Sequence, residues 1–526
     1  MKRKILLVLP KNLEINFINV SEILKLITRR SGGAPVLSLA TIAALTLPDF
    51  DVKIIDEDVE LVDFNESFDI VGIGGFSCYL NRAQEIAREF SKRGSLIVCG
   101  GSPVTFKPER WRPFADVLIV GEAERTWPQF LRDYLTGTIK LEYYERNEID
   151  LSASPIPDFS GVPGRIMRKY FWGIVQTSRG CPYKCEFCSL HGYLGNKIRY
   201  KPVSNIIQEV EQLYKIGSFR IIVIADDNFS SDKKKAKEIL NALTEWNSKK
   251  RYPVTFIAQV SIDVAKDEEF LELSVKAGLT RFSVGVETPN KKSLEETKKH
   301  QNVRSNLLED IKKIHQHGIL VHAGSIVGFD NDDLSIFQQQ YDFFKESGIP
   351  NIQVMPLQAP DGSPLMKRMI KEGRYIDWEQ SAKDNPGQIN SMNTFTIIPK
   401  QMTTKQLYNG LCWLLKNLYI PENFIYRLKT FFENYEQSPI KDKLKISRLP
   451  LDFRSISMTA RFIKFILTKA TPKERKVFRK MYNVARLSSH PHKFLFLTGA
   501  FLSLLNTHNI LRKSFPLIDS IEYPLK

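Results

Sequence analysis

Short apolar runs alternate with helical patterns along the first third of the chain. Amphipathic stretches such as 39–47 and 82–93 lie between the runs, which are mainly aliphatic and predict buried strands. The predicted strands are Lys4–Leu9, Val52–Ile55, Asp69–Ile73, Leu96–Val98 and Asp116–Val120. Because this alternation is typical of a parallel sheet covered by helices on both faces, we predict a doubly wound, Rossmann-like α/β domain over residues 1–145.

The alternation of strand and helix patterns resumes after a linker that we place at residues 146–169. The strand patterns are Gly173–Thr177, Arg220–Ala225, Val254–Gln259, Arg281–Val286, Leu320–Val327 and Asn351–Pro356. Six strand–helix units in this order predict a partial (β/α)6 barrel over residues 170–360. Barrels of this kind carry their chemistry at the C-terminal ends of the strands, so polar residues at those ends are candidate site residues.

The barrel pattern stops after residue 360. A helix is predicted over Thr403–Leu418, with Thr403 as its N-cap, in a mainly helical extension over residues 361–440. Residues 441–526 then contain 18 Lys and Arg but five Asp and Glu, which gives a net charge of +13 out of +16 for the whole chain. Because this segment also holds the apolar run Phe494–Leu505, we predict a basic, apolar helical tail domain.

Two interpretations of this tail stay open. The first is a small helical domain with a solvated basic face. The second is docking on an anionic membrane surface, because basic amphipathic helices beside apolar runs favour anionic lipids. Binding of nucleic acid is disfavoured, since no recognised nucleic-acid-binding motif accompanies the charge.

The composition is that of a soluble globular protein, with 526 residues of which 43% are hydrophobic and 25% charged. It excludes disordered, collagen-like and disulfide-scaffold classes. The apolar run behind the basic start, Ile5–Leu9, is far shorter than a signal-peptide core, and no stretch of about 20 apolar residues could span a bilayer. We expect a cytoplasmic protein, with peripheral contact on the inner membrane face as an open alternative, and cysteines that bind metal rather than form disulfides.

Three cysteines stand close together in the segment that follows the first barrel strand. Cys181, Cys185 and Cys188 have the spacing Cys-x3-Cys-x2-Cys. Three thiolates on one loop can each hold one iron of a [4Fe–4S] cluster and leave the fourth iron without a protein ligand. A zinc site with His191 as fourth ligand is the minor alternative, since structural zinc sites use four ligands. The other cysteines, Cys78, Cys99 and Cys412, are isolated, and packing is the expectation for each.

The spacing of these cysteines, with the aromatic Phe187 before the last one, resembles the signature of the radical SAM enzymes. The resemblance implies that S-adenosylmethionine (SAM) chelates the open iron and is cleaved to a 5′-deoxyadenosyl radical. It assigns Asp226 or Asp227, after the second barrel strand, to the SAM amino group, and Glu287 to its ribose. The full set of candidate SAM-binding residues is Asp226, Asp227, Gln259, Ser261, Glu287, Gly324 and Ile326. For Ser261, and for Asn228 beside this set, capping of the next helix is an equal alternative.

The N-terminal domain resembles the cobalamin-binding domain that precedes the barrel in many radical SAM enzymes. The matching stretches are Gly100-Gly101-Ser102-Pro103 and Gly121-Glu122-Ala123-Glu124, which follow predicted strands. Ligands of doubly wound sheets bind beyond the carboxyl ends of the strands, where glycine lets the backbone approach closely. The implied cobalamin contacts are Ser77, Tyr79, Gly100, Gly101, Ser102, Gly121 and Glu122. The Asp-x-His-x-x-Gly motif that supplies a cobalt ligand in many cobalamin proteins is absent, so the lower face of cobalt is unassigned.

Scattered matches such as Ala225-Asp-Asp-Asn-Phe229 and Val286-Glu-Thr-Pro289 resemble one branch of this family, which includes the hopanoid C-2 methylases. That resemblance implies methylation of an unactivated carbon, with methylcobalamin as methyl donor. It also implies a lipid or other small-molecule substrate and an electron donor such as flavodoxin or ferredoxin. Four residues, of which Tyr79 is also among the implied cobalamin contacts, are candidates to line the pocket, each with a structural role as alternative: Tyr79, His191, Tyr193 and Arg199.

Two other functions stay open at this stage. The first is a radical SAM enzyme that forms a C–C bond, a ring or an oxidation product without methyl transfer, with or without cobalamin. The absent cobalt-ligand histidine keeps this alternative open. The second is an iron–sulfur or zinc protein that is not an enzyme and uses its basic tail to bind nucleic acid. Cleavage of SAM by the reduced protein separates the second alternative from both enzymes.

Overall fold

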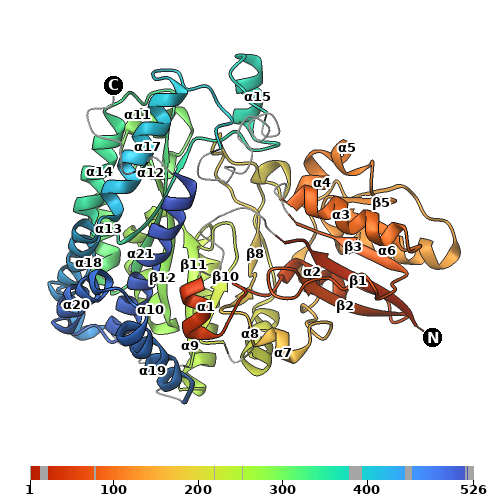
Figure 1. Ribbon diagram of the computed structural model, residues 1–526, viewed down its shortest axis with the longest axis horizontal. Coiled ribbons are helices and arrows are strands. Elements are labelled where there is room, and N and C mark those ends of the chain that lie inside the picture. Colours follow the sequence, from red (N-terminus) through yellow and green to blue (C-terminus); the bar gives the residue numbers. More distant parts are fainter. Residues whose placement is uncertain are drawn as a thin grey trace.

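The computed structural model describes residues 2–11, 22–75, 79–217, 219–251, 253–377, 394–444, 453–515 and 518. Ser77 and Cys78 therefore lie outside the described residues. The described chain forms two parallel six-stranded sheets, each covered by helices, and a set of C-terminal helices that pack on the second sheet (Figure 1). This is the predicted α/β architecture with a helical C-terminal region.

The first sheet has the strand order β2-β1-β3-β4-β5-β6 and is parallel throughout. Its strands are β1 (Arg3–Leu9), β2 (Phe50–Asp56), β3 (Ile70–Ile73), β4 (Leu96–Gly100), β5 (Val117–Val120) and β6 (Glu142–Tyr144). Helices α2 (Leu37–Ala44), α3 (Leu80–Ser91), α4 (Ser102–Phe106), α5 (Pro108–Trp111) and α6 (Ala123–Thr136) cover it. The five predicted strands are present, and the order reverses between β1 and β3, where sheets of this type bind ligands.

The second sheet is a partial barrel with the order β14-β13-β12-β11-β10-β7, again all parallel. Its strands are β7 (Gly173–Val175), β10 (Ile221–Ile224), β11 (Thr255–Val260), β12 (Leu279–Glu287), β13 (Leu320–Val327) and β14 (Asn351–Pro356). The main outer helices are α8 (Val203–Gly217), α9 (Lys233–Lys249), α10 (Glu268–Ala277), α13 (Leu307–Gln316) and α14 (Ile336–Ser347). Strands β14 and β7 are edges of this sheet, so the barrel is open between them, as predicted.

The C-terminal region is helical and packs on the barrel. It comprises α15 (Pro364–Lys371), α17 (Thr404–Tyr419), α18 (Pro421–Glu436), α19 (Phe453–Thr468), α20 (Pro472–Arg486) and α21 (Lys493–Ser514). Helix α17 starts with a capping box in which the Thr403 side chain accepts from the Gln406 backbone N–H, as its predicted N-cap role requires. Helix α1 (Glu22–Thr28) comes from the N-terminal part of the chain and packs against α19 and α21.

The apolar run of the tail lies in α21, and much of it is inside the protein. Among the described residues, α21 is the one helix long and apolar enough to cross a membrane, and half of its most apolar stretch is buried in the molecule. Helix α19 instead exposes Ile456, Ile463 and Leu467, which the helical period places on one face. Docking of the tail on an anionic membrane stays a prediction, and these three residues are the apolar side chains that such docking would use.

Candidate active site

The three cysteines lie in the loop that follows β7, at the C-terminal end of the barrel strands. The loop begins at Gly180, whose φ of 92° favours glycine. A Cβ at this position would also collide with the carbonyl oxygen of Lys197. Cys185 is buried, and Cys181 and Cys188 are partly buried. The sequence prediction of their place in the fold is therefore correct.

The cysteine thiols are grouped and shielded from water. Burial raises the pKa of all three thiols, that of Cys188 to about 11, and the neighbouring thiol of Cys185 contributes to the rise at Cys181 and Cys188. Such thiols are protonated until iron replaces the proton, because metal ligation deprotonates a thiol outright. Three adjacent thiols with this chemistry fit the three-cysteine ligation of a [4Fe–4S] cluster.

Two anchors hold the cysteine loop to the rest of the barrel. At its start, the buried carboxylate of Asp226 accepts from Thr177 N at 2.6 Å, from Ser178 Oγ at 2.7 Å and from the Thr177 hydroxyl. At its centre, Glu186 forms a bidentate pair with Arg368 of α15 at 2.8 and 3.0 Å. Bidentate pairs of this kind fix orientation as well as charge, so the loop is held in place from both sides.

Asp226 and Asp227, which the sequence could not distinguish, have different surroundings. The side chain of Asp226 is buried, and the hydrogen bonds that it accepts come from Thr177 and Ser178 at the start of the cysteine loop. Asp227 is partly exposed and accepts one bond, from Gly180 N at 3.2 Å. Burial raises the pKa of Asp227 to about 6, and a bound cation would stabilise its ionised form. Asp227 is therefore the better placed of the two for an ammonium group.

Glu287 ends β12 in a backbone conformation that non-glycine residues seldom adopt, with φ 64°. Its carboxylate pairs with the Lys299 ammonium at 2.6 Å, and Asn302 Nδ2 donates at 2.9 Å to the carbonyl oxygens of Gly285 and Val286. Positive φ at such a residue is costly and persists where surrounding contacts enforce it. Lys299 also lies over the ring of Phe187, 5.8 Å from its centroid, so this pair links the end of β12 to the cysteine loop.

The other candidate SAM residues occupy two kinds of position. Ser261 Oγ accepts from Asn228 Nδ2 at 2.6 Å, so it is engaged in joining the loops after β10 and β11. Gln259 and Gly324 lie on the inner face of the barrel, where Gln259 is exposed and a Cβ added to Gly324 would meet no atom closer than 3.9 Å. Ile326 packs beside the apolar cluster that contains Phe329. The inner face of the barrel therefore has open space beside Gln259 and Gly324.

The loops after the first-sheet strands face the cysteine end of the barrel. Phe106, at the end of α4, packs against Gly192 and Gly362, and its ring centroid lies 6.3 Å from that of Tyr193. Lys107 pairs with Asp361 at 2.6 Å. The carboxyl ends of both sheets are thus turned toward each other, which is the arrangement needed for ligands of the two domains to meet.

The candidate cobalamin residues surround these loops. Gly101 and Gly121 have φ of 106° and 89°, values that favour glycine. A Cβ on Gly101 would stand 3.4 Å from the carbonyl oxygen of Gly75, so the loops after β3 and β4 approach each other closely. Tyr79 is buried, with its ring packed on Gly75, and Gly100 and Ser102 flank Gly101.

Glu122 has a different environment from the one expected of a ligand contact. Its buried carboxylate accepts from Arg179 Nη1 at 2.7 Å, from Arg199 Nη1 at 2.5 Å and from Ile149 N at 3.1 Å. Arg179, which precedes the first cysteine by two residues, also pairs with Glu124 at 2.6 Å. We name the set of Glu122, Glu124, Arg179 and Arg199 the interdomain ion network. It ties the first sheet to the cysteine loop.

The pocket-lining candidates lie at this same junction. Arg199 belongs to the interdomain ion network, and Tyr193 packs against Phe106. His191 is partly buried, and its Nε2 atom is enclosed without a hydrogen-bond partner. Sequence reasoning missed Arg179, Lys299 and Arg368, although the basic residue two positions before Cys181 was visible as a charge beside the motif.

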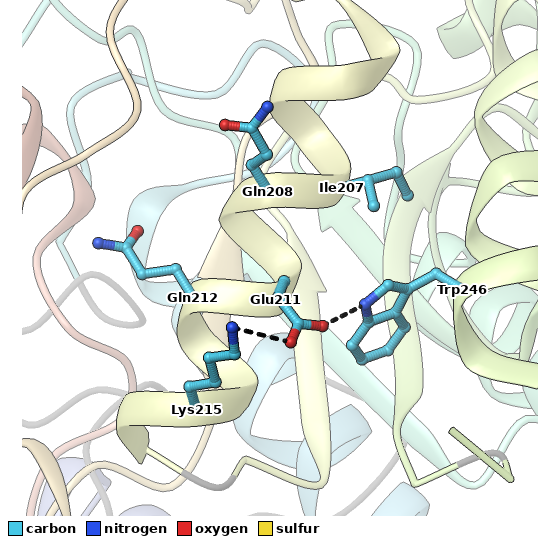
Figure 2. A pocket seen from close by; sticks show the side chains of 6 residues that line it. All are labelled: Ile207, Gln208, Glu211, Gln212, Lys215 and Trp246. Atoms are coloured by element: carbon cyan, nitrogen blue, oxygen red, sulfur yellow. Dashed lines mark hydrogen bonds and ion pairs between the residues drawn. The ribbon is translucent and has the colours of Figure 1, made fainter. Parts of the chain in front are cut away.

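One surface hollow of about 440 Å³ lies elsewhere, on the outside of the barrel between α8 and α9 (Figure 2). Glu211 crosses it, accepting from Trp246 Nε1 at 2.8 Å and pairing with Lys215 at 3.3 Å and Lys250 at 2.9 Å. These groups satisfy one another, and the hollow is remote from the strand ends that carry the cysteines. It is not part of this site.

Comparison with known proteins agrees with this geometry. Residues 175–344 match the model of the radical SAM superfamily, and residues 363–504 match a domain of unknown function, DUF4070. An uncharacterized methyltransferase of Synechocystis is 29% identical over 84% of this chain and 81% of its own. The hopanoid C-2 methylase of Rhodopseudomonas palustris is 28% identical over 65% of each chain.

Solved structures share the fold at low identity. The radical SAM methyltransferase TsrM of Kitasatospora setae, solved with cobalamin and a [4Fe–4S] cluster, has a TM-score of 0.61, with 15% identity over 88% of this chain and all of its own. The cobalamin-dependent enzyme OxsB has a TM-score of 0.59, with 16% identity over 99% of this chain and 84% of its own. With the cysteine loop at the end of β7 inside the matched segment, residues 175–344 form a radical SAM domain, and the chain shares its fold with cobalamin-dependent enzymes of that superfamily.

Proposed function

We propose that the protein is a cobalamin-dependent radical SAM methyltransferase that methylates an unactivated carbon. The observation that carries the proposal is the way the two sheets meet. The strand-end loops of the first sheet contact the loop of the three cysteines through Phe106 and the interdomain ion network. A ligand held by the first sheet and one held by the barrel would then share a single enclosed space.

The chain's own residues bind, orient and exclude water. Cys181, Cys185 and Cys188 would hold the cluster, and Asp227 and Glu287 would bind SAM at the strand ends. The glycines after β3, β4 and β5 would let cobalamin approach the backbone closely. When bound, the cluster and cobalamin supply the electron and the methyl group, which are chemistry that no side chain provides. The interdomain ion network would keep the two cofactor-binding edges in register.

Reconstituted protein is the direct test of this proposal. Anaerobic protein with a restored cluster, cobalamin, SAM and a reductant should release both 5′-deoxyadenosine and S-adenosylhomocysteine. The second product reports transfer of the SAM methyl group and can be measured by chromatography before the final substrate is known. If 5′-deoxyadenosine forms alone, with cobalamin bound, the proposal of methyl transfer fails, and radical chemistry without methylation becomes the better account.

The contrast between the two aspartates gives a sharper prediction. Asp227→Asn should weaken SAM binding by about 10-fold or more, because a charge-assisted hydrogen bond contributes roughly 1.5–3 kcal/mol. Asp226→Asn should instead lower thermal stability and leave SAM affinity nearer to that of the parent, because its carboxylate serves the cysteine loop. Equilibrium binding of SAM to the cluster-loaded protein and thermal unfolding measure both effects. Equal loss of SAM affinity in the two variants would contradict the assignment.

A further inference from the structure

The inner face of the barrel can be identified from one aromatic contact. Phe282 of β12 packs on Phe270 of the outer helix α10, with ring centroids 6.2 Å apart. Because side chains alternate along a strand, the residues on either side of Phe282, Arg281 and Ser283, point into the barrel. Ser283 is in register with Gln259 of β11 and with His322 of β13, so these side chains form one inward layer.

This inward layer is polar and open. Gln259 and His322 are exposed, and neither makes a side-chain hydrogen bond within the described part of the chain. His322 is nevertheless surrounded by protein, since burial, together with the charge of Arg281, lowers its pKa to about 4. A side chain that is exposed although protein surrounds it lines a cavity. Barrel interiors are usually filled by branched apolar side chains, so an open polar layer suggests a binding function.

The C-terminal helix α21 lies against the start of β12, at the end of the barrel interior opposite the cysteine loop (Figure 1). The ring of Phe496 sits 5.7 Å from the Arg281 guanidinium carbon, and a Cβ on Gly499 would stand 3.2 Å from Arg281 Nη2. The small residue at 499 therefore makes room for the guanidinium group. Arg281 therefore stands at the end of the barrel interior that α21 covers.

Arg281 has no counter-charge. Across the described residues its side chain forms no ion pair and no hydrogen bond, and it lies against the ring of Phe496. Two other arginines held deep in the fold have polar partners: Arg427 donates to the carbonyl oxygens of Ile349, Pro350 and Leu418, and Arg199 pairs with Glu122. Burial lowers the pKa of Arg281 to about 10, a sign of an uncompensated cation. Arg281 is partly exposed, so its charge faces the open interior of the barrel and no protein carboxylate. A cation left unpaired in such an enclosed space points to an absent anionic partner.

We propose that the barrel interior is the substrate site and that Arg281 binds an anionic group of the substrate, a carboxylate or a phosphate. That the bound molecule is the substrate of the enzyme rests on the proposed function. Neutral His322 and Gln259 add hydrogen bonds to the same group from the layer above. Arg281 stands six residues before Glu287, or about 20 Å along the strand. A substrate anchored on Arg281 and reacting at the strand ends is therefore elongated, with its anionic end deep in the barrel.

Calorimetric titration of the full chain with inorganic phosphate and with acetate, at constant ionic strength, tests the site. One or both anions should bind to the parent protein, and which anion binds distinguishes phosphate from carboxylate. Arg281→Gln should weaken that binding by at least about 10-fold, as expected for loss of a charge-assisted bond, while Arg281→Lys keeps part of it. Exposed Arg132, changed to Gln, is the matched control and should bind as the parent does. Absence of binding by both anions to the parent would overturn the proposal.

Stability of the anion-free protein separates this role from a structural one. If Arg281 awaits an anion, Arg281→Gln should unfold at the same or a higher temperature than the parent, because a cation without a counter-charge is removed. If its contact with Phe496 is what holds α21 in place, the variant should unfold at a lower temperature, and the proposal fails. Formation of 5′-deoxyadenosine and S-adenosylhomocysteine by the parent protein tests the proposed methyltransferase function separately from the anion titration. Failure of the anion site is thereby distinguished from failure of the proposed methyltransferase function.

Discussion

Replacing Cys181, Cys185 or Cys188 by alanine should reduce SAM cleavage to background, a loss of at least about 1,000-fold, because ligands that act as one unit cannot be removed singly without losing the whole. Each variant should also lose the absorption and electron paramagnetic resonance signals of a reduced [4Fe–4S] cluster. The measurement is 5′-deoxyadenosine released by the anaerobically reconstituted, reduced protein. The expected loss follows from the grouping of the three thiols in one loop at the end of β7.

Cys412→Ala supplies the matched control for this experiment. Cys412 is also a buried, free cysteine, but it lies on α17, away from the cysteine loop. This variant should keep its cluster and most of its SAM cleavage, with a small loss of stability from the missing sulfur. Undiminished nucleoside release by any of the three loop variants would remove the basis for the cluster site.

Glu122→Ala should destabilise the protein by about 3–5 kcal/mol, the cost of leaving a buried ion pair with one partner. Arg199 loses its ion-pair partner, whereas Arg179 keeps Glu124. Denaturant unfolding followed by tryptophan fluorescence measures the loss. Because the network joins the two sheets, limited proteolysis between residues 146 and 169 should also become faster.

Glu89→Ala is the control for the interdomain ion network. Glu89 pairs with Lys92 and Arg93 at the solvent-facing C-terminal end of α3, and exposed pairs of this kind contribute little to stability. The double variant Glu122→Ala, Arg199→Met removes both the carboxylate and the cation that it leaves unpaired, and it should recover part of the loss. A Glu122 variant as stable as the Glu89 variant would show that the network does not hold the domains together.

The parts of the fold that depend on local pattern were predictable. Five of the six first-sheet strands and the barrel strands are mainly apolar runs bounded by turns, and the cysteine motif lies within eight residues. Strand β6 was missed, because Glu142–Tyr144 is a short edge strand of polar and aromatic residues with little periodicity to read. The apolar run of α21 was ambiguous for a physical reason: the inside of a protein and the inside of a membrane favour the same residues.

The roles that depend on distant residues were not predictable. Glu122 pairs with Arg179 and Arg199, which are 57 and 77 positions away, and no local spacing encodes such contacts. The same holds for Arg281, which points into the barrel. Only its surroundings in the fold show that its positive charge has no anionic partner. Asp226 and Asp227 are neighbours in sequence, and only their hydrogen bonds in the fold distinguish their roles.

The floor that α21 gives to the barrel has a consequence for how the chain is made. The last barrel strand ends at Pro356, whereas α21 starts at Lys493, so all six strands leave the ribosome well before the helix that seals them. Until that helix arrives, the interior lies open to water and the apolar surface beneath β12 is bare. Non-local closure of this kind slows folding and leaves intermediates prone to aggregation. Versions of the protein shortened at the C-terminus should therefore accumulate as insoluble chains, even though every residue proposed to bind a cofactor is still present.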